Sequence, residues 1–214
     1  TNLKVTSVTA ISFVFQWNAS TGNVSGYNVY RNGQYYGTTS STSMLISGLC
    51  PGTAYSLYII PYNNYGPGEQ SETKSFSTYS YSISGNTTVC TSSNTTFTFN
   101  NRPSGVSIDW TQSSNIQYIS GQGTDQYTVR AAAGGTAWVK ATVSSISGCT
   151  TPTVYNYPVW SGAPVVSVTG PAEGCTNTQY TFQAHTNNPE NTYPFSYTWE
   201  IYPYDGYIST SNGG

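Results

Sequence analysis

Short runs of alternating apolar and polar residues recur along the chain. Two clear examples span residues 11–17 and 55–60. A period of two is typical of half-buried β-strands. Thr, Val, Ile, Tyr and Phe dominate the runs, and Gly, Pro, Asn and Ser interrupt them at roughly the spacing of short strands in sandwiches. The pattern predicts an all-β fold.

Residues 1–78 contain enough such runs for one complete sandwich. Asn32-Gly33 separates two of the runs and predicts a type I′ hairpin turn, because both central residues of that turn need positive φ. The string Leu49-x-Pro-Gly-Thr-x-Tyr55 predicts a turn followed by a tyrosine corner, in which a tyrosine hydroxyl bonds to upstream backbone. The seven strands are expected near residues 3–8, 11–18, 25–31, 34–38, 42–47, 54–61 and 71–77.

Four features of this first module follow one another in a recognisable order: Trp17, Gly26-Tyr27-x-Val29, Leu49 to Tyr55, and Asn63-Asn64-Tyr65-Gly66. In these features residues 1–78 resemble a fibronectin type III domain. The resemblance implies a seven-stranded sandwich and no catalysis. It also implies an interior formed by Trp17, Tyr27, Val29, Leu49, Tyr55, Leu57 and Ile59.

The rest of the chain contains an internal repeat. Residues 83–99 align with residues 168–182, so that Cys90 corresponds to Cys175. Each copy continues to a tryptophan in a strand-like run, Trp110 in one and Trp199 in the other. Repetition at this scale indicates two modules of one kind.

This layout of cysteine, tryptophan and turn resembles the immunoglobulin-like and PKD-like modules found in tandem in large secreted or surface proteins of Bacteroidetes-type bacteria. The resemblance divides the remaining chain into a second module, residues 79–163, and a third, residues 164–214. Together the two resemblances imply antiparallel β-sandwiches in tandem. The third contains only the front half of the repeat, so we expect the natural protein to continue. Short junctions at residues 77–81 and 161–165 suggest limited bending.

Four cysteines permit three complete pairings, and the residues alone do not choose among them. In the resembling family an early cysteine commonly faces a Gly-Cys near the last strands. That carry-over pairs Cys90 with Cys149, and Cys175 with a residue beyond 214. Cys50 is interpreted as a partly exposed free thiol or, alternatively, as a partner to another module. Four reduced, buried cysteines are the remaining alternative; a disulfide would favour an oxidising, extracytoplasmic location.

Composition removes several classes of function. Only 7% of the 214 residues are charged and the net charge is −2, whereas Thr and Ser together supply 62 residues. This balance lacks the basic surface that nucleic-acid binding requires, and no apolar run is long enough for a membrane helix. We therefore expect neither nucleic acid nor membrane insertion.

Catalytic and metal-binding patterns are not found in the sequence. The single histidine, His185, is interpreted as a surface strand residue, and Asp109 and Asp125 as solvated side chains. The Gly-x-Gly at residues 121–123 lacks the following helix that a phosphate site needs, so we interpret it as a turn between strands. No enzyme activity, cofactor or metal is expected within this chain.

Tyrosine is the most suggestive functional feature, because 20 are present and half of any strand faces outward. Tyrosine offers a flat apolar face and a hydroxyl, which suits sugars and proteins alike. The alternative is that tyrosine only replaces charge as a surface-compatible strand former. The candidate binding residues are Tyr35, Tyr36, Tyr58, Tyr202 and Tyr204.

The sequence thus favours non-catalytic spacer or adhesion modules of a larger extracellular or cell-surface protein, with glycans or other surface proteins as partners. The alternative is that they are accessory modules of a secreted polysaccharide hydrolase or protease whose catalytic domain lies elsewhere in the parent polypeptide.

Overall fold

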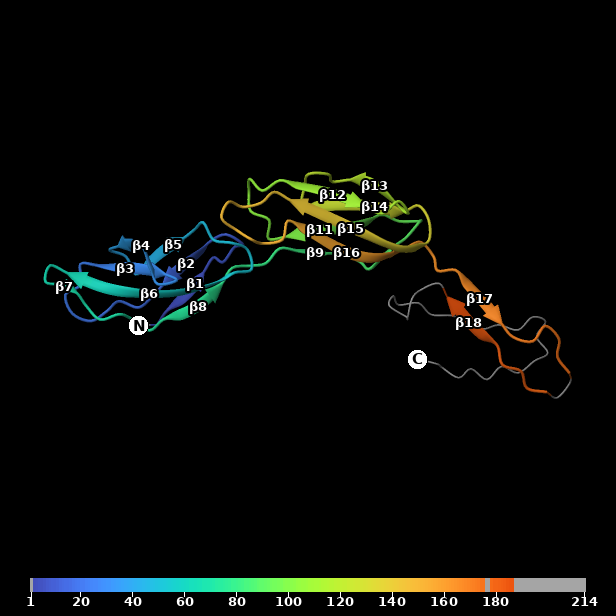
Figure 1. Cartoon of the computed structure of the whole chain (residues 1–214), viewed down its shortest axis with the longest axis horizontal. Helices are drawn as coiled ribbons and strands as arrows, with labels where there is room; N and C mark the ends of the chain where they lie inside the picture. Colours follow the sequence, from blue (N-terminus) through green and yellow to red (C-terminus); the bar gives the residue numbers. More distant parts are fainter. Residues whose placement is uncertain (1, 176–177, 187–214) are drawn as a thin grey trace.

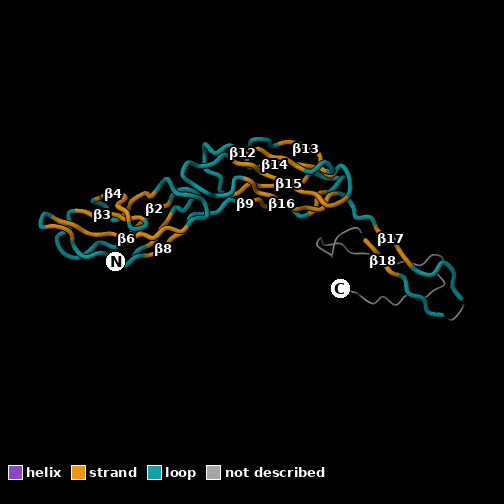
Figure 2. The backbone as a smooth tube through the Cα atoms, in the orientation of Figure 1, coloured by secondary structure: helices purple, strands orange, loops and turns teal. Residues whose placement is uncertain are grey.

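The computed structural model describes residues 2–175 and 178–186. The regular secondary structure of these residues consists of β-strands alone. Two sandwiches lie end to end and are followed by a two-stranded hairpin (Figures 1 and 2). The all-β fold class predicted from the alternating pattern is therefore confirmed.

The first module pairs a three-stranded sheet with a five-stranded one. The small sheet has the order β1-β2-β5; the larger has the order β4-β3-β6-β7, with β8 also paired to β6. Its strands are β1 (Lys4–Thr6), β2 (Phe13–Gln16), β3 (Gly26–Arg31), β4 (Gln34–Thr39), β5 (Ser43–Ile46), β6 (Ala54–Asn63), β7 (Gly66–Pro67) and β8 (Lys74–Ser77). The seven predicted strands are present, and β7 is a short addition before the last.

The core of the first module lies between these two sheets. Buried and partly exposed residues alternate along β6: Tyr55, Leu57 and Ile59 are buried, and the residues between them are partly exposed. All seven residues expected inside are buried, with Phe13 and Phe15 beside them. The predicted interior is confirmed.

Both predicted turns of the first module are also confirmed. Asn32 and Gly33 have φ of 49° and 76°, as a type I′ turn requires. The Cys50 N–H donates to the Tyr55 hydroxyl at 2.7 Å, which is the expected tyrosine corner.

The second module consists of two four-stranded sheets, β13-β14-β11-β9 and β10-β16-β15-β12. Its pairings are antiparallel except for β10, which runs parallel to β16. Its strands are β9 (Ser82–Ser84), β10 (Thr88–Val89), β11 (Thr95–Asn100), β12 (Ile108–Gln112), β13 (Ile116–Ser120), β14 (Gln126–Ala131), β15 (Gly135–Val143) and β16 (Val154–Ser161).

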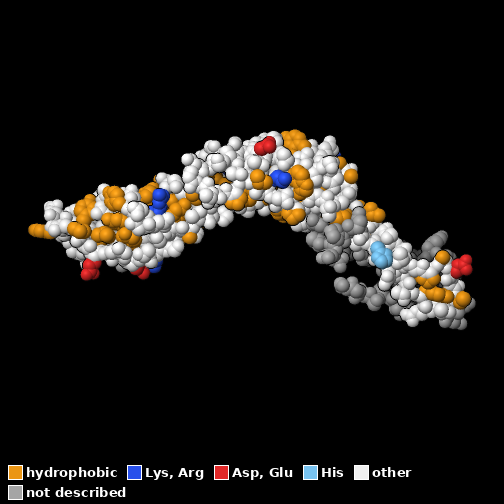
Figure 3. Space-filling view, viewed as in Figure 1, with side chains coloured by type: hydrophobic (Ala, Val, Ile, Leu, Met, Phe, Trp, Pro, Cys, Tyr) orange, Lys and Arg blue, Asp and Glu red, His pale blue; other side chains and the backbone are white. Residues whose placement is uncertain are grey.

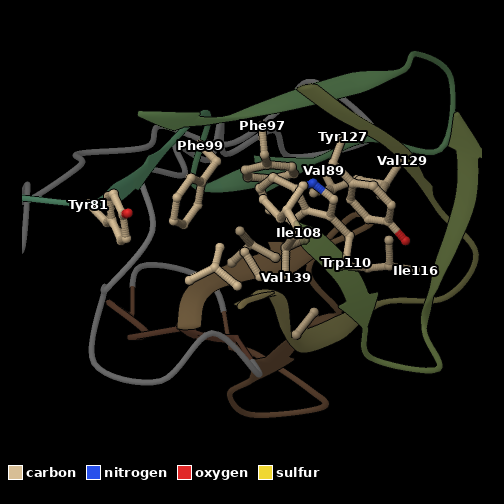
Figure 4. Packing of buried hydrophobic residues seen from close by; sticks show 14 of the residues in the cluster. Tyr81, Val89, Phe97, Phe99, Ile108, Trp110, Ile116, Tyr127, Val129 and Val139 are labelled. Atoms are coloured by element: carbon tan, nitrogen blue, oxygen red, sulfur yellow. The ribbon is translucent and has the colours of Figure 1, made fainter. Parts of the chain in front are cut away.

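Aromatic side chains fill the space between these sheets (Figure 4). The Trp110 ring stacks on Tyr127 with centroids 5.1 Å apart and planes at 6°. Phe97 and Phe99 from β11 are buried beside them. The Trp110 Nε1–H donates to the Thr124 carbonyl at 2.9 Å, so this large core side chain has its polar atom satisfied.

The Gly-x-Gly at residues 121–123 is the turn between β13 and β14, as predicted. Gly121 has φ of 99°, and a Cβ there would lie 1.9 Å from the Gln126 carbonyl oxygen, so only glycine fits. The neighbouring Gln122 side chain accepts from the Trp110 N–H and donates to the Trp110 carbonyl. The turn therefore has a structural role: it ties β12 to the opposite sheet.

The third segment repeats the first strand pairing of the second module. Strands β17 (Val166–Thr169) and β18 (Gln183–Thr186) pair in the register of β9 with β11, each partner shifted by 85 residues, from 84 to 169 and from 98 to 183. The Phe97 ring lies against Gly85, and the Phe182 ring lies against Gly170 in the same way. The internal repeat is confirmed over these strands. Trp199, Tyr202 and Tyr204 lie outside the described residues.

Candidate functional site

Ionisable side chains are scattered over the described residues, with no group of three or more His, Cys, Asp or Glu placed to hold a metal ion. On the face drawn in Figure 3 the charged side chains form isolated spots. Asp125 pairs with Arg102, whereas Asp109 accepts from the Gln122 amide. His185 lies on β18 and shares a 2.8 Å hydrogen bond with Thr169. Each of these groups is engaged in a local contact.

The disulfide joins two modules, and the expected pairing of Cys90 with Cys149 is wrong. Cys149 is bonded to Cys50, with Cα atoms 5.4 Å apart, and Cys90 is an exposed free thiol. Cys50 therefore takes the alternative assigned to it, a partner to another module. Cys175 is likewise a free, exposed thiol.

The short linker explains why these two cysteines meet. β8 ends at Ser77 and β9 begins at Ser82, so the ends of the two sandwiches adjoin. Cys50 lies in the turn between β5 and β6, and Cys149 in the loop between β15 and β16. Both segments face the contact between the modules, and the bridge spans it. We call this region, with its disulfide and linker, the joint.

Hydrogen bonds hold the linker residues of the joint. The Tyr79 N–H donates to the Thr9 carbonyl and the Gly52 N–H to the Tyr79 carbonyl, both at 3.0 Å. The Thr78 hydroxyl donates to the Cys50 carbonyl at 2.6 Å. On the other side, the Asn101 amide donates to the Ser80 carbonyl at 2.8 Å. Linker backbone is thus fixed to both modules.

Apolar packing continues across the joint. Ala10, from the first module, is 1% exposed and belongs to the buried cluster of the second. Ile11 packs against the same cluster, as does Ile146 from the loop that carries Cys149. Domains in one chain move relative to each other unless their contact is apolar and extensive, and Ala10 and Ile11 give this contact an apolar centre.

Tyrosines of the first module gather on the outer face of its larger sheet. Tyr30 on β3 lies opposite Tyr35 on β4 and Tyr58 on β6, so the three form one row across the strands. The Tyr30 and Tyr58 rings stack at 4.7 Å and 7°, and the Tyr35 ring meets Tyr30 edge-on at 5.9 Å. We call these residues the tyrosine row.

A hollow of about 260 Å³ adjoins the tyrosine row at the β3–β4 turn, lined by Arg31, Asn32, Gln34, Tyr35 and Tyr36. The Tyr36 hydroxyl accepts from the Ser47 N–H at 2.9 Å, and the Arg31 guanidinium lies over the Tyr36 ring at 5.0 Å. The structure therefore brings the predicted Tyr35 and Tyr58 into one row on the outer face, whereas Tyr36 packs against the core on the inner side of the sheet and meets Tyr35 only at the hollow.

Two models of known families match this chain. Residues 1–77 match the fibronectin type III domain, and residues 77–159 match the PKD-like domain. The chain carries a fibronectin type III domain followed by a PKD-like domain. The tyrosine row lies on the fibronectin type III domain, and the disulfide links it to the PKD-like domain.

Curated relatives of the chain are bacterial enzymes. Chitinase A1 of Niallia circulans is 30% identical over 160 residues, which is 74% of this chain and 22% of that protein. An alpha-amylase of the same organism is 46% identical over 67 residues, 30% of this chain and 5% of the enzyme. Exoglucanase B of Cellulomonas fimi is 28% identical over 178 residues, 80% of this chain and 16% of the enzyme. The chain thus spans less than a quarter of each of these relatives.

Among the described residues we find no helix with the length and apolar character needed to span a bilayer. The fibronectin type III and PKD-like domains account for residues 1–159. Domains of these two types are typically non-catalytic modules of larger proteins.

Sequence reasoning missed one residue of these regions, Tyr30, and gave the pairing of another, Cys50, only as an alternative. Tyr30 completes the tyrosine row, and its alternation with buried Val29 was a signal that it faces outward. Cys50 completes the disulfide, but its partner is 99 residues away in another module, and strand periodicity contains no information on contacts between modules.

Proposed function

We propose that this chain is a non-catalytic pair of accessory modules in a secreted polysaccharide-degrading protein, where it acts as a stiff spacer between other parts of the parent polypeptide. The names of three relatives, a chitinase, an alpha-amylase and an exoglucanase, support the polysaccharide-degrading parent over a surface adhesin. An extracellular location agrees with the disulfide, because such bonds persist in oxidising compartments.

The joint is the observation that carries the spacer proposal. A flexible tether would place a polar, unattached linker between domains. Here the Cys50–Cys149 bond, the hydrogen bonds of residues 78–80 and the buried Ala10 all act on the same contact. A pair joined in this way keeps a fixed length and direction, which is what separation of two functional parts requires.

Small-angle X-ray scattering on the whole chain tests the spacer. The oxidised chain is expected to scatter as an extended particle of one shape. The Cys50→Ser/Cys149→Ser variant is expected to show a wider distribution of shapes, because its modules are held only by non-covalent contacts. Cys90→Ser is the matched control, since it removes an exposed thiol of the same chain and leaves the joint unchanged. Scattering from the oxidised chain that fits only a broad ensemble would reject the stiff spacer.

A reducing-end assay tests the non-catalytic part. Incubation of the chain with chitin, cellulose and starch is expected to release no sugar above the blank. Release that disappears on Asp109→Asn or Asp125→Asn would instead make the chain an enzyme.

A further inference from the structure

The tyrosine row is not needed to fill the core of the fibronectin type III domain. The buried cluster of that domain is formed on the inner face of the sheet, where Val29 and Leu57 alternate with Tyr30 and Tyr58 along their strands. Tyr35 is 58% exposed. Three aromatic rings on one outer face are more than a surface strand requires, and aromatic side chains are enriched where proteins bind partners.

The rings of the row are held in place before any ligand arrives. Tyr30 and Tyr58 form a stacked pair, and Tyr35 contacts Tyr30 edge-on. Cross-strand pairs of this kind restrict the side chains to a few conformations. Binding to such a face costs little conformational entropy, because the rings are already ordered.

Polar groups beside the row suit hydroxyl groups of a ligand. In the hollow, the Gln34 side chain makes no hydrogen bond within the described residues, and Asn32 uses its Oδ1 to accept from the Ser56 N–H. Amide groups can both donate to and accept from sugar hydroxyls. The hollow thus adds directional polar contacts to the flat apolar faces of the row.

The charge of this region favours a neutral ligand. Arg31 is the one charged residue that lines the hollow, and no residue of the tyrosine row is acidic or basic. The Arg31 guanidinium is already engaged: it donates to the Ser47 carbonyl at 3.3 Å and lies over the Tyr36 ring. An anionic ligand would find no second cation here, whereas a neutral one needs none.

The shape of the face favours an extended ligand. The row crosses three neighbouring strands. Thr38 and Ile60 both pair with Asn28 and continue the same outer face along the sheet. A sheet face presents its side chains on a nearly flat surface, although it twists gently. β-Linked polysaccharides are extended, with apolar C–H faces and hydroxyl edges.

We propose that the tyrosine row and its adjoining hollow bind a neutral, β-linked polysaccharide such as cellulose or chitin. The choice of polysaccharide over protein rests on the proposed function, whereas the binding face itself rests on the residues above. The spacer can fail while this face binds, and the face can fail while the spacer is stiff, so the two experiments give separate answers.

Sedimentation of the whole chain with insoluble polysaccharide tests the site. The probes are microcrystalline cellulose, chitin and insoluble starch. The chain is expected to bind cellulose or chitin more strongly than starch. Tyr35→Ala is expected to weaken that binding by about tenfold, the loss typical of one central aromatic contact. Gln34→Ala is expected to weaken it less, because the hydrogen bonds of an exposed amide to the ligand replace bonds that it already makes to water.

Tyr65→Ala is the matched control, because Tyr65 lies in the same domain, is 96% exposed and stands outside the row. Its binding is expected to equal that of the unchanged chain. Thermal unfolding of each variant establishes that the fold is intact. The proposal is overturned by absence of binding to all three probes, by preference for starch, by equal binding of the Tyr35 variant, or by equal losses in the Tyr35 and Tyr65 variants.

Discussion

The two sandwiches of this chain use tyrosine in opposite ways. In the fibronectin type III domain, Tyr30, Tyr35 and Tyr58 stand on an outer sheet face and contact one another. In the PKD-like domain, Tyr127 is buried against Trp110, and Tyr81 is buried beside Phe99. The same side chain is thus a surface group in one domain and a core group in the other. A tyrosine that faces the opposite sheet of its sandwich fills the core with its ring, whereas one that faces away presents its ring and hydroxyl to the solvent.

The largest expected effect comes from removal of the ring that anchors the second core. Trp110→Ala would empty the centre of the PKD-like domain and lower its unfolding free energy by about 3–5 kcal/mol. Chemical denaturation followed by near-ultraviolet circular dichroism would measure the loss. Tyr35→Ala, a change on the outer face, is expected to cost less than about 1 kcal/mol. Similar losses of unfolding free energy in the two variants would contradict the contrast between the aromatic core of the second domain and the exposed tyrosines of the first.

The next effect concerns the bond that joins the two domains. Reduction of Cys50–Cys149 opens a loop of about 100 residues, for which the chain-entropy model gives roughly 4.7 kcal/mol, with measured values often smaller. We expect the reduced chain to unfold at lower denaturant concentration and in two separated transitions. Calorimetry with and without a dithiol reductant would record this. A Cys90→Ser chain that lost stability to the same degree without reductant would argue against the assignment.

High pH should distinguish the buried tyrosines. Burial raises the pKa of Tyr127 to about 12, and Tyr118 and Asp109 add to the rise; burial also raises the pKa of Tyr81 and Tyr155. Because the pKa is higher in the folded state, the neutral tyrosine hydroxyl stabilises the fold. That contribution to the unfolding free energy is fully present below pH 10, the unfolded pKa, and is lost as pH rises toward 12. Denaturation at a series of pH values should show the decline.

Tyr127→Phe is the matched variant for that series, since it keeps the ring and removes the ionisable hydroxyl. Its stability should fall less steeply between pH 10 and 12 than that of the unchanged chain, with a residual slope from Tyr81 and Tyr155. An identical slope in the two chains would remove Tyr127 as its source.

A smaller effect on stability is expected at the tyrosine corner. Tyr55→Phe removes the acceptor of the Cys50 N–H and keeps the buried ring. The loss should be about 1 kcal/mol, typical of one neutral hydrogen bond. The melting temperature of the fibronectin type III domain would report it. An unchanged melting temperature would show that the bond adds no net stability.

Local features of the fold could be predicted well. Alternation identified the strands of the first domain, Asn32-Gly33 its hairpin turn, and Tyr55 its corner, because each depends on residues near one another in the chain. The repeat predicted the shared register of β9–β11 and β17–β18 for the same reason. The tyrosine row was predicted only in part, since Tyr35 and Tyr58 were singled out and Tyr30 between them was not.

The sequence by itself determined the strand pattern, the two types of domain and the sides of the strands that are buried, because side-chain period and turn chemistry are local. Only the tertiary structure decided the disulfide and the row. Cys149 pairs with Cys50 and not with Cys90 because the short linker brings the ends of two sandwiches together. Tyr30, Tyr35 and Tyr58 meet because strand register places three separate segments side by side. Both are contacts between distant residues, which depend on how the whole chain folds in space.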